Sequence, residues 1–293
     1  MTEKKMMRGL ASVLALGLAA VLCAGCSSSG TSSAGGSSSA AGGSSSAVES
    51  SAAGKTLTVG MELAYPPFET KDAAGNPSGI SVDLAKALGE YLNRPVTIEN
   101  INWDGLIPSL QTGKVDVVIS SMTITAERSE VVDFSDPYAH SYLALLVNSN
   151  SNINGVEDLD QESKVVDVKK GTTGYVYATK YLTRAKVNAL SSENACVTEV
   201  TQAKADAFIY DQLTIYRQNQ TNKETTKAIL IPFQDSENWG MAVNKGNTEL
   251  LGKINEFIAQ YKAEGGFGKL TEKYLSEEKK TFDSLGFSWF FDD

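Results

Sequence analysis

A turn rich in hydroxyl groups, with an arginine beside it, is the first feature of this 293-residue chain that could bind a ligand. The apolar run at 115–120 predicts a buried strand, and Ser121, Thr123 and Arg128 follow its end. An arginine can form a bidentate, charge-assisted pair with a carboxylate. Ser and Thr also cap helices, and a lone arginine is commonly solvated, so these residues alone leave a ligand site open.

A second turn has the composition of an anion site. The sequence KKGTTG at 169–174 contains Thr173 and opens a helix predicted over 175–182. A helix N-terminus presents unpaired N–H groups and the positive end of its dipole, which favour a carboxylate or phosphate.

Asp211 and several aromatic residues supply what the other end of a ligand would need. Asp211 closes a strand predicted at 205–210 and either receives an ammonium group or caps the following helix. Tyr65, Phe68 and Trp103 follow strand ends, where aromatic residues form either ligand walls or core. An anion site, a carboxylate and aromatic walls together suit a zwitterion, and an α-amino acid is the commonest one.

The elements that must position these turns alternate short apolar runs with amphipathic helical patterns, which is typical of an α/β fold. Strands are predicted at 56–60, 115–120, 143–147, 164–168 and 205–210, and helices at 80–92, 175–182, 250–261 and 269–275. Ligands of open α/β sheets sit outside the carboxyl ends of the strands, so the turns above are the expected place for a site.

Composition excludes several classes of function. The chain has 26 Lys+Arg against 35 Asp+Glu, a net charge of −9, which argues against a partner nucleic acid because such binders cluster basic residues. One His and three Cys are too few for a zinc site with two CxxC pairs or an HExxH motif, since Cys23 and Cys26 form a single CxxC pair. We therefore expect no metal and no cofactor.

The N-terminal part has the layout of an exported lipoprotein. Residues 1–25 read as a signal peptide, with basic residues before an uncharged apolar run at 10–22 that is short for a membrane span. LCAGC at 22–26 resembles the lipobox of bacterial lipoproteins, which implies lipidation of Cys26. Cys23 stands where that motif usually has Leu, and the alternative is a plain secreted protein.

Residues 26–54 are expected to form a tether between the lipid and the fold. From residue 27 to 54, 25 of 28 residues are Ser, Gly or Ala, which have too little apolar surface to offset the entropy of ordering. Because cleavage removes Cys23 and lipid occupies Cys26, Cys196 has no disulfide partner in the mature chain. We expect Cys196 to be a small buried apolar residue.

Six stretches of the folded part resemble the extracytoplasmic solute-binding proteins of polar amino-acid ABC importers, solute-binding protein family 3. Members of this family have the type II periplasmic-binding-protein fold. The matching stretches are YPPFE at 65–69, GISVDLAKALGEYL at 79–92, WDGLIPSLQTGKVDVVISSMTITAERSEVVDFSDPY at 103–138, KKGTTGYVYA at 169–178, ADAFIYD at 205–211 and NWGMAVNKGNTELLGKINEFI at 238–258.

The resemblance implies a role for each matching position. Arg128 looks like the clamp of the ligand α-carboxylate, and Asp211 looks like the acid that receives its ammonium. Glu62 falls where the family often has an acid facing the ligand side chain. The remaining implied contacts are Ser121, Thr123 and Thr173 around the carboxylate and amino group, Tyr65 and Trp103 as enclosing aromatics, and Ser120 and Tyr210 as cleft lining. The resemblance implies no catalytic residue and no metal ligand.

The same resemblance implies two lobes, each a mostly parallel sheet flanked by helices, joined by two hinge crossings. Lobe 1 would comprise 55–138 plus 240–293, and lobe 2 would comprise 142–234, with crossings near 138–142 and 235–239. The chain continues past the usual end of the family, near Tyr274, through an aromatic tail. We expect that tail to pack against lobe 1, with a docking role as the alternative.

The predicted function is non-enzymatic: the protein binds an extracellular amino acid and delivers it to the permease subunits of an ABC importer. Glu62 favours a polar or basic amino acid by charge pairing. The protein is expected to be a monomer, lipid-anchored on the extracellular face of the cell membrane, or periplasmic in a Gram-negative cell. The alternatives are an enzyme on the same scaffold, such as a cyclohexadienyl dehydratase, and a ligand-sensing domain that acts through a partner.

Overall fold

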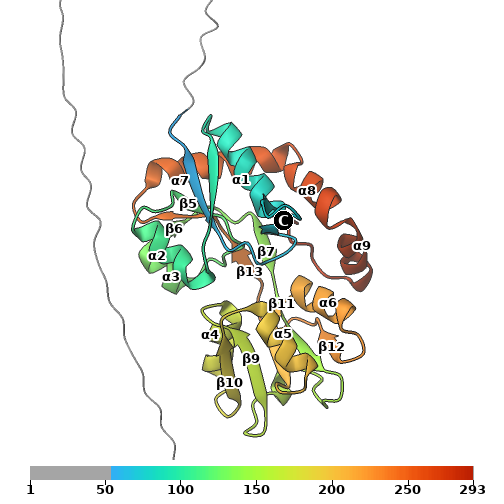
Figure 1. Ribbon diagram of the computed structural model, residues 1–293. Helices are drawn as coiled ribbons and strands as arrows, with labels where there is room; N and C mark the ends of the chain where they lie inside the picture. Colours follow the sequence, from blue (N-terminus) through green and yellow to red (C-terminus); the bar gives the residue numbers. More distant parts are fainter. Residues whose placement is uncertain (1–53, 293) are drawn as a thin grey trace, which may run out of the picture. The chain divides into compact units, whose positions relative to one another are not determined.

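Two five-stranded sheets with helices against their faces organise residues 54–292, the part of the chain that the computed structural model describes (Figure 1). We call the half built on the first sheet lobe 1 and the half built on the second sheet lobe 2. The predicted two-lobed α/β architecture is confirmed. The predicted signal peptide, the lipidated Cys26 and the tether up to residue 53 lie outside the described residues.

Lobe 1 contains the sheet with strand order β4-β1-β5-β14-β6. Helices α1, α7, α8 and α9 share one hydrophobic core with β1, and α2 packs in a second core on the opposite face. The elements of this lobe are β1 (Leu57–Met61), β2 (Thr70–Lys71), β3 (Pro77–Ser78), α1 (Ile80–Tyr91), β4 (Val96–Asn100), η1 (Trp103–Gly105), α2 (Leu106–Gln111), β5 (Val117–Val118), α3 (Ala126–Val131), β6 (Val132–Phe134), β14 (Ala242–Asn244), α7 (Thr248–Ala263), α8 (Gly266–Tyr274) and α9 (Ser276–Leu285).

Lobe 2 contains the sheet with strand order β10-β9-β11-β8-β12. Helix α4 packs on one face, and α5 and α6 pack on the other, where Cys196 is a buried free thiol as predicted. The elements of this lobe are β8 (Leu143–Asn148), η2 (Val156–Asp158), β9 (Val165–Lys169), α4 (Thr173–Tyr181), β10 (Lys186–Leu190), α5 (Glu193–Thr201), β11 (Ala207–Asp211), α6 (Gln212–Thr221) and β12 (Thr226–Ile229).

The sheets are mixed, which refines the expectation of mostly parallel sheets. Within the described residues, β1 runs parallel to β4 and β5 while β14 runs antiparallel to β5 and β6. In lobe 2, β9 runs parallel to β10 and β11 while β8 runs antiparallel to β11 and β12. The antiparallel strands β14 and β8 are the ones that directly follow a passage between the lobes, so the chain enters each sheet there in the opposite direction.

A separate antiparallel pair, β7 (Ala139–Ser141) with β13 (Glu237–Trp239), carries the chain between the lobes. In Figure 1 this pair stands between the two sheets. Both strands fall in the segments predicted as hinge crossings. Glu237 begins β13, and its position matters for the site described below.

The strand predicted at 115–120 is shorter in the structure, and the residues left out of it form a turn. β5 covers only Val117–Val118, because the backbone leaves the sheet at Ser120 and adopts a positive φ of 50° at Ser121. The hydroxyl oxygen of Ser120 accepts a hydrogen bond from the backbone N–H of Glu62 at 3.0 Å. The turn after β5 is thereby fixed against the turn after β1.

The aromatic tail packs into the core of lobe 1, as predicted. Phe282, Trp289 and Phe290 are at most 3% exposed. The carbonyl of Phe290 accepts a hydrogen bond from the backbone N–H of His140 in β7, at 2.8 Å. The tail also reaches lobe 2, where the ring of Phe282 meets that of Tyr216 edge to face at 5.8 Å.

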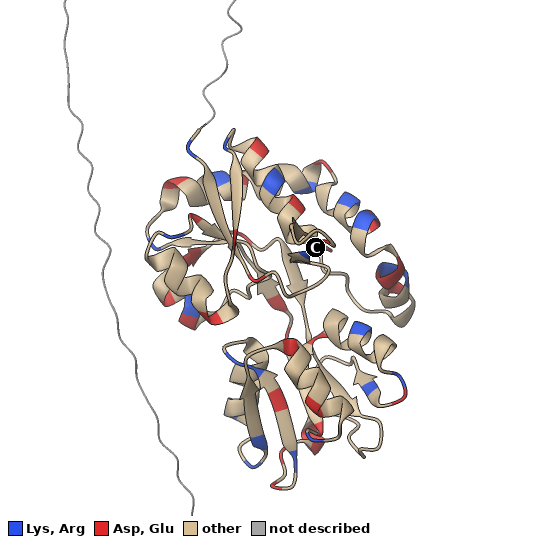
Figure 2. Ribbon diagram, viewed as in Figure 1, with Lys and Arg blue, Asp and Glu red and all other residues tan. Residues whose placement is uncertain are grey.

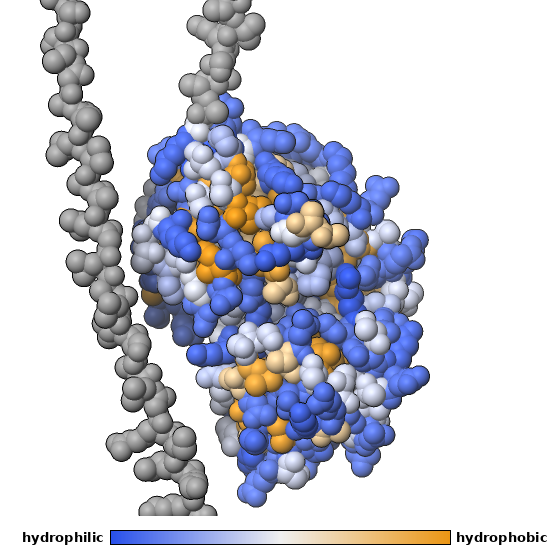
Figure 3. Space-filling view, in the orientation of Figure 1, coloured by the Kyte–Doolittle hydropathy of each residue, from blue (hydrophilic) through white to orange (hydrophobic). Residues whose placement is uncertain are grey.

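The surface of the described residues is mostly hydrophilic on the face that Figure 3 shows. On the face shown in Figure 3, hydrophobic residues form separate groups in a mostly hydrophilic surface. Between residues 54 and 292, no helix has the length and apolar character needed to cross a membrane.

Candidate functional site

A cavity between the two lobes gathers all ten residues that the sequence predicted for the site. About 520 Å³ of space not filled by protein atoms lies there, part of it open to solvent. The predicted residues that line it are Glu62, Tyr65, Trp103, Ser120, Ser121, Thr123, Arg128, Thr173, Tyr210 and Asp211. Glu69, Ser141, Thr172, Glu237 and Trp239 line it as well and were not predicted.

The ends of the strands position these side chains. In lobe 1, Glu62 directly follows β1, and Ser120 and Ser121 follow β5. In lobe 2, Thr172 and Thr173 follow β9, and Asp211 ends β11. The carboxyl ends of strands in both sheets therefore face one cavity, as the rule for open α/β sheets predicts.

Arg128 is held by local hydrogen bonds on the lobe 1 wall. Thr125 caps helix α3 by accepting from the backbone N–H of Arg128, which fixes the arginine in the first turn. Its guanidinium donates from Nη1 to the carbonyl of Thr123 at 2.7 Å. Burial lowers the pKa of Arg128, but an arginine remains charged at neutral pH.

Arg128 and Trp103 also reach across to lobe 2. The carbonyl of Gly171 accepts from Arg128 Nη2 at 3.1 Å and from Trp103 Nε1 at 3.0 Å. The guanidinium carbon lies 5.3 Å from the centre of the indole ring, within the range of a cation–π contact. Two donors of lobe 1 thus share one acceptor of lobe 2 at the edge of the cavity.

Asp211 caps a helix, which is one of the two roles that the sequence left open. Its Oδ1 accepts from the backbone N–H of Thr214 at 3.0 Å and so caps helix α6. Its Oδ2 is buried and has no hydrogen bond of good geometry among the described residues. Burial raises the pKa of Asp211, although the hydroxyl of Tyr65 lies near enough to lower it in part. A buried carboxylate oxygen that lacks a donor favours a cationic group placed beside it.

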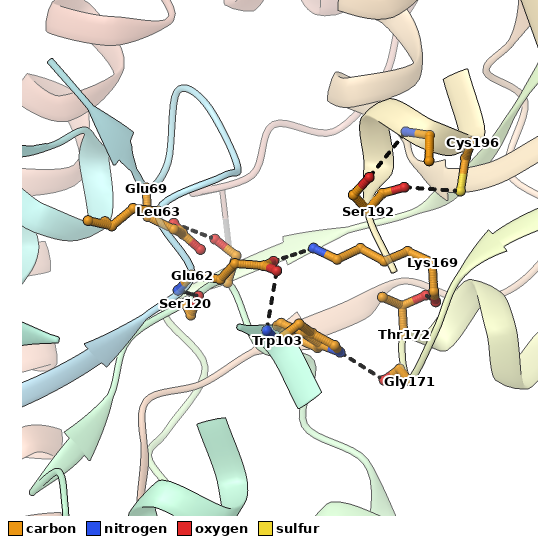
Figure 4. Close-up of polar contacts among 12 residues, drawn as sticks. Glu62, Leu63, Glu69, Trp103, Ser120, Lys169, Gly171, Thr172, Ser192 and Cys196 are labelled. Atoms are coloured by element: carbon orange, nitrogen blue, oxygen red, sulfur yellow. Dashed lines mark hydrogen bonds and ion pairs between the residues drawn. The ribbon is translucent and has the colours of Figure 1, made fainter. Parts of the chain in front are cut away.

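Glu62 has a partner that the sequence did not reveal. The ammonium of Lys169, from lobe 2, forms an ion pair with Glu62 Oε2, as Figure 4 shows. Glu62 Oε1 accepts from the backbone N–H of Trp103 at 3.2 Å. The side chains of Lys169 and Glu62 are 3% and 13% exposed, so the pair is largely desolvated. The charge of Glu62 is therefore compensated inside the protein.

A third carboxyl in the cavity wall, that of Glu69, is fully buried. The hydroxyls of Ser81 and Ser121 donate to its Oε2 at 2.7 and 3.2 Å, while Oε1 has no partner among the described residues. Burial raises the pKa of Glu69 from 4.5 to about 8, and the hydrogen bonds oppose that rise only in part. Burial therefore favours the neutral form of Glu69.

Glu237, at the start of β13, is the fourth carboxyl group of the cavity, and sequence reasoning missed it. Acidic residues stand where β13 meets the lobes in Figure 2. The Oε2 atom of Glu237 accepts from the hydroxyls of Thr123 at 3.1 Å and Thr173 at 2.7 Å. Burial raises the pKa of Glu237, and the nearby charge of Arg128 opposes this.

The aromatic residues of the cavity form part of its wall and part of the core. Tyr65 is stacked on Phe68 with ring centres 5.3 Å apart and meets Tyr210 edge to face at 5.8 Å. Phe68, which does not line the cavity, is 2% exposed.

In residues 54–292, no group of three or more His, Cys, Asp or Glu is arranged to hold a metal ion.

Comparison with known proteins gives consistent matches over most of the fold. A family model described as bacterial extracellular solute-binding proteins, family 3, matches residues 57–277. The L-arginine-binding protein of Pseudomonas aeruginosa is 32% identical over 232 residues, which cover 76% of this chain and 89% of that protein.

Two solved structures are similar in fold and sequence. An ancestral arginine-binding protein bound to glutamine has a TM-score of 0.70 and 38% identity, covering 76% of this chain and 98% of that one. An ancestral amino acid-binding protein described as a precursor of cyclohexadienyl dehydratase has a TM-score of 0.68 and 37% identity, covering 75% and 94%.

Proposed function

Because the chain belongs to the bacterial extracellular solute-binding proteins of family 3, we propose that it binds an amino acid between its lobes and delivers it to an ABC importer. One observation carries the proposal. A single cavity presents the guanidinium of Arg128 on one wall and the buried Oδ2 of Asp211 on the other. An α-carboxylate and an α-ammonium complement these two groups.

The roles of the other residues follow from this orientation of the ligand. Ser121, Thr123 and Thr173 supply hydroxyl groups around its carboxylate and amino group. Tyr65 and Trp103 enclose it, while Ser120 and Tyr210 line the cleft. Glu62 faces the ligand side chain.

The ion pair between Glu62 and Lys169 limits which ligand side chains can bind beside Glu62. An unpaired Glu62 would favour a cation, but a cationic side chain here must compete with Lys169 for the same carboxylate. A neutral side chain that both donates and accepts hydrogen bonds can contact Glu62 and Lys169 while they remain paired. We therefore favour a polar amino acid with a carboxamide, such as glutamine, over a basic one.

Ligand binding is proposed to close the two lobes. We assign lobe 1 to 55–138 plus 240–293 and lobe 2 to 142–234, with the hinge in the crossings that contain β7 and β13. A ligand that contacts Arg128 and Asp211 at once favours the closed arrangement by its differential affinity for it. The permease subunits of the importer would distinguish closed from open protein.

The proposed location follows from the N-terminal sequence. Members of the family are extracytoplasmic. We propose that residues 1–25 are removed, that Cys26 carries the lipid, and that the protein acts as a monomer anchored to the extracellular face of the membrane, or in the periplasm of a Gram-negative cell.

An enzyme on this scaffold is the second candidate. The similar structure described as a dehydratase precursor favours it, as does Glu69, a carboxyl in the cavity wall whose neutral form could act as a general acid. The P. aeruginosa relative is named as a binding protein, and Arg128 and Asp211 on opposite walls of the cavity suit the binding of a zwitterion without a reaction. Sustained turnover of prephenate or arogenate by the purified protein would favour the enzyme.

Calorimetric titration of ligand-stripped protein with each of the twenty amino acids tests the main proposal. We expect binding of one or a few polar amino acids, with glutamine preferred over arginine and acidic amino acids excluded by the carboxylates of the cavity. Absence of binding by the whole panel would refute the proposal, and a preference for arginine would refute the role given to Lys169.

A further inference from the structure

The carboxylate of Glu237 occupies groups that the proposed function assigns to the ligand. Its Oε2 accepts the hydroxyls of Thr123 from lobe 1 and Thr173 from lobe 2, at 3.1 and 2.7 Å. Its Oε1 accepts from the side-chain amide of Gln234 at 2.7 Å. The charge of Glu237 also interacts with that of Arg128. A side-chain carboxylate and an α-carboxylate are the same chemical group, so they need the same donors.

We propose that Glu237 is an internal competitor of the ligand's α-carboxylate, and that it determines the affinity of the site by occupying the hydroxyls of Thr123 and Thr173. This inference rests on the proposed function, because it takes Arg128 as the carboxylate clamp. An incoming amino acid displaces Glu237 from these two hydroxyls. Two carboxylates within a few ångströms repel each other, so the displacement costs free energy that would otherwise add to binding.

The surroundings of Glu237 allow this displacement. Glu237 lies at the start of β13, in a crossing between the lobes rather than inside either sheet. It is only partly buried and lines the cavity as well as two neighbouring surface grooves, one of which also contains Gln234, Asp235 and Asn238. The side chain therefore has solvent-accessible space on the side away from the cavity.

The competition has a consequence for transport. A carrier that holds its ligand with every available donor would release it slowly, since affinity differences appear mainly in the dissociation rate. As the ligand carboxylate leaves, Glu237 can again accept hydrogen bonds from the hydroxyls of Thr123 and Thr173. Its charge then partly balances the charge of Arg128. The residue thus lowers affinity in a way that favours release.

The test combines a substitution in the protein with one in the ligand. Glu237→Gln keeps the size of the side chain and removes its charge, and the α-carboxamide of the amino acid removes the charge of the ligand. The control is Glu224→Gln, an exposed acid in lobe 2 outside the cavity. The three proteins are titrated calorimetrically with the amino acid that the wild-type protein binds best and with its α-carboxamide.

We expect Glu237→Gln to bind the amino acid about tenfold more tightly than the wild-type protein, because the repulsion between two carboxylates is lost. Affinity for the α-carboxamide should change by less than about twofold, since that ligand has no charge to repel. Glu224→Gln should match the wild-type protein with both ligands. Glu237→Ala should show the same ligand-dependent gain, which guards against a folding defect of one variant.

Equal or weaker binding of the amino acid by both Glu237 variants would overturn the inference. An equal gain for the amino acid and its α-carboxamide would also overturn it, because Glu237 would then act on lobe closure instead of the carboxylate. A wild-type protein that binds no amino acid would refute the proposed function, and this inference with it.

Discussion

Replacing Glu69 by glutamine is expected to remove a large part of the pH dependence of folding stability. In the unfolded chain this carboxyl ionises near its ordinary pKa of 4.5, whereas burial in the fold raises its pKa to about 8. Between these values the unfolded state binds fewer protons than the folded state, so the free energy of unfolding falls as the pH rises. The stabilising contribution is complete below 4.5 and is lost as the pH passes about 8.

The size of the effect follows from the two pKa values. A difference of about 3.5 corresponds to about 5 kcal/mol in total, of which about 3.5 kcal/mol falls between pH 5 and pH 8. Because Glu69 is fully buried, solvent does not screen this cost. Glutamine keeps an oxygen that can accept from the hydroxyls of Ser81 and Ser121 and does not titrate.

The assay is urea unfolding of the wild-type protein and Glu69→Gln at pH 5, 6, 7 and 8. Asp167 and Glu193, with pKa values raised by burial to about 6 and about 7, titrate in both proteins and cancel in the difference. Relative to the wild-type protein, the variant should gain about 3.5 kcal/mol between pH 5 and pH 8. The exposed control Glu224→Gln should show a constant difference. A constant difference for Glu69→Gln as well would refute the assignment of a neutral, buried carboxyl.

Three further substitutions test the ligand site and the tail. Lys169→Met should raise the affinity for arginine relative to glutamine by about tenfold in calorimetric titration, because Glu62 loses its internal partner. An unchanged ratio of the two affinities would contradict the proposed specificity. Arg128→Ala should weaken binding of every amino acid by at least about a hundredfold, whereas near wild-type affinity would mean that the carboxylate binds elsewhere. Phe282→Ala should lower the free energy of unfolding by about 3–5 kcal/mol in urea unfolding. Leu285 lies in the same helix and is 53% exposed, so Leu285→Ala should change this free energy little. Equal effects of the two substitutions would contradict the packing of the tail.

Hydrophobic patterning was sufficient to predict most of the fold. The apolar stripe predicted for α1 comprises Ile80, Leu84, Leu88 and Tyr91, and the helix begins at the predicted residue. The first three side chains are buried, whereas Tyr91 in the last turn is 37% exposed. Strand direction could not be predicted in the same way. The apolar run of β8 is buried on both faces whether its neighbours run parallel or antiparallel, so its composition carries no information on direction.

The candidate site was predictable where its residues follow strand ends, as Arg128 and Asp211 do. Lys169 was missed because a basic residue beside a glycine-rich turn suits an anion site, and only the approach of Glu62 from the other lobe gives it a different role. Glu237 was missed for the same physical reason, since its contact with Thr123 joins residues 114 positions apart. The spacing of residues within one segment predicts local geometry. It gives no information on which charged residues of the two lobes will pair with each other.

That pairing bears on how a binding protein of this kind discriminates and releases its ligand. In the structure, Lys169 compensates Glu62, and Glu237 partly compensates Arg128. A ligand therefore exchanges existing interactions for new ones, and its affinity is the difference between the two sets. Asp211 differs from these four residues, because its Oδ2 has no hydrogen bond of good geometry among residues 54–292. The ammonium of the ligand then gains a new interaction at Asp211, while its carboxylate and side chain must each replace an internal group. On this reasoning Asp211 contributes mainly to affinity, whereas Glu62, Lys169 and Glu237 contribute mainly to selectivity and release.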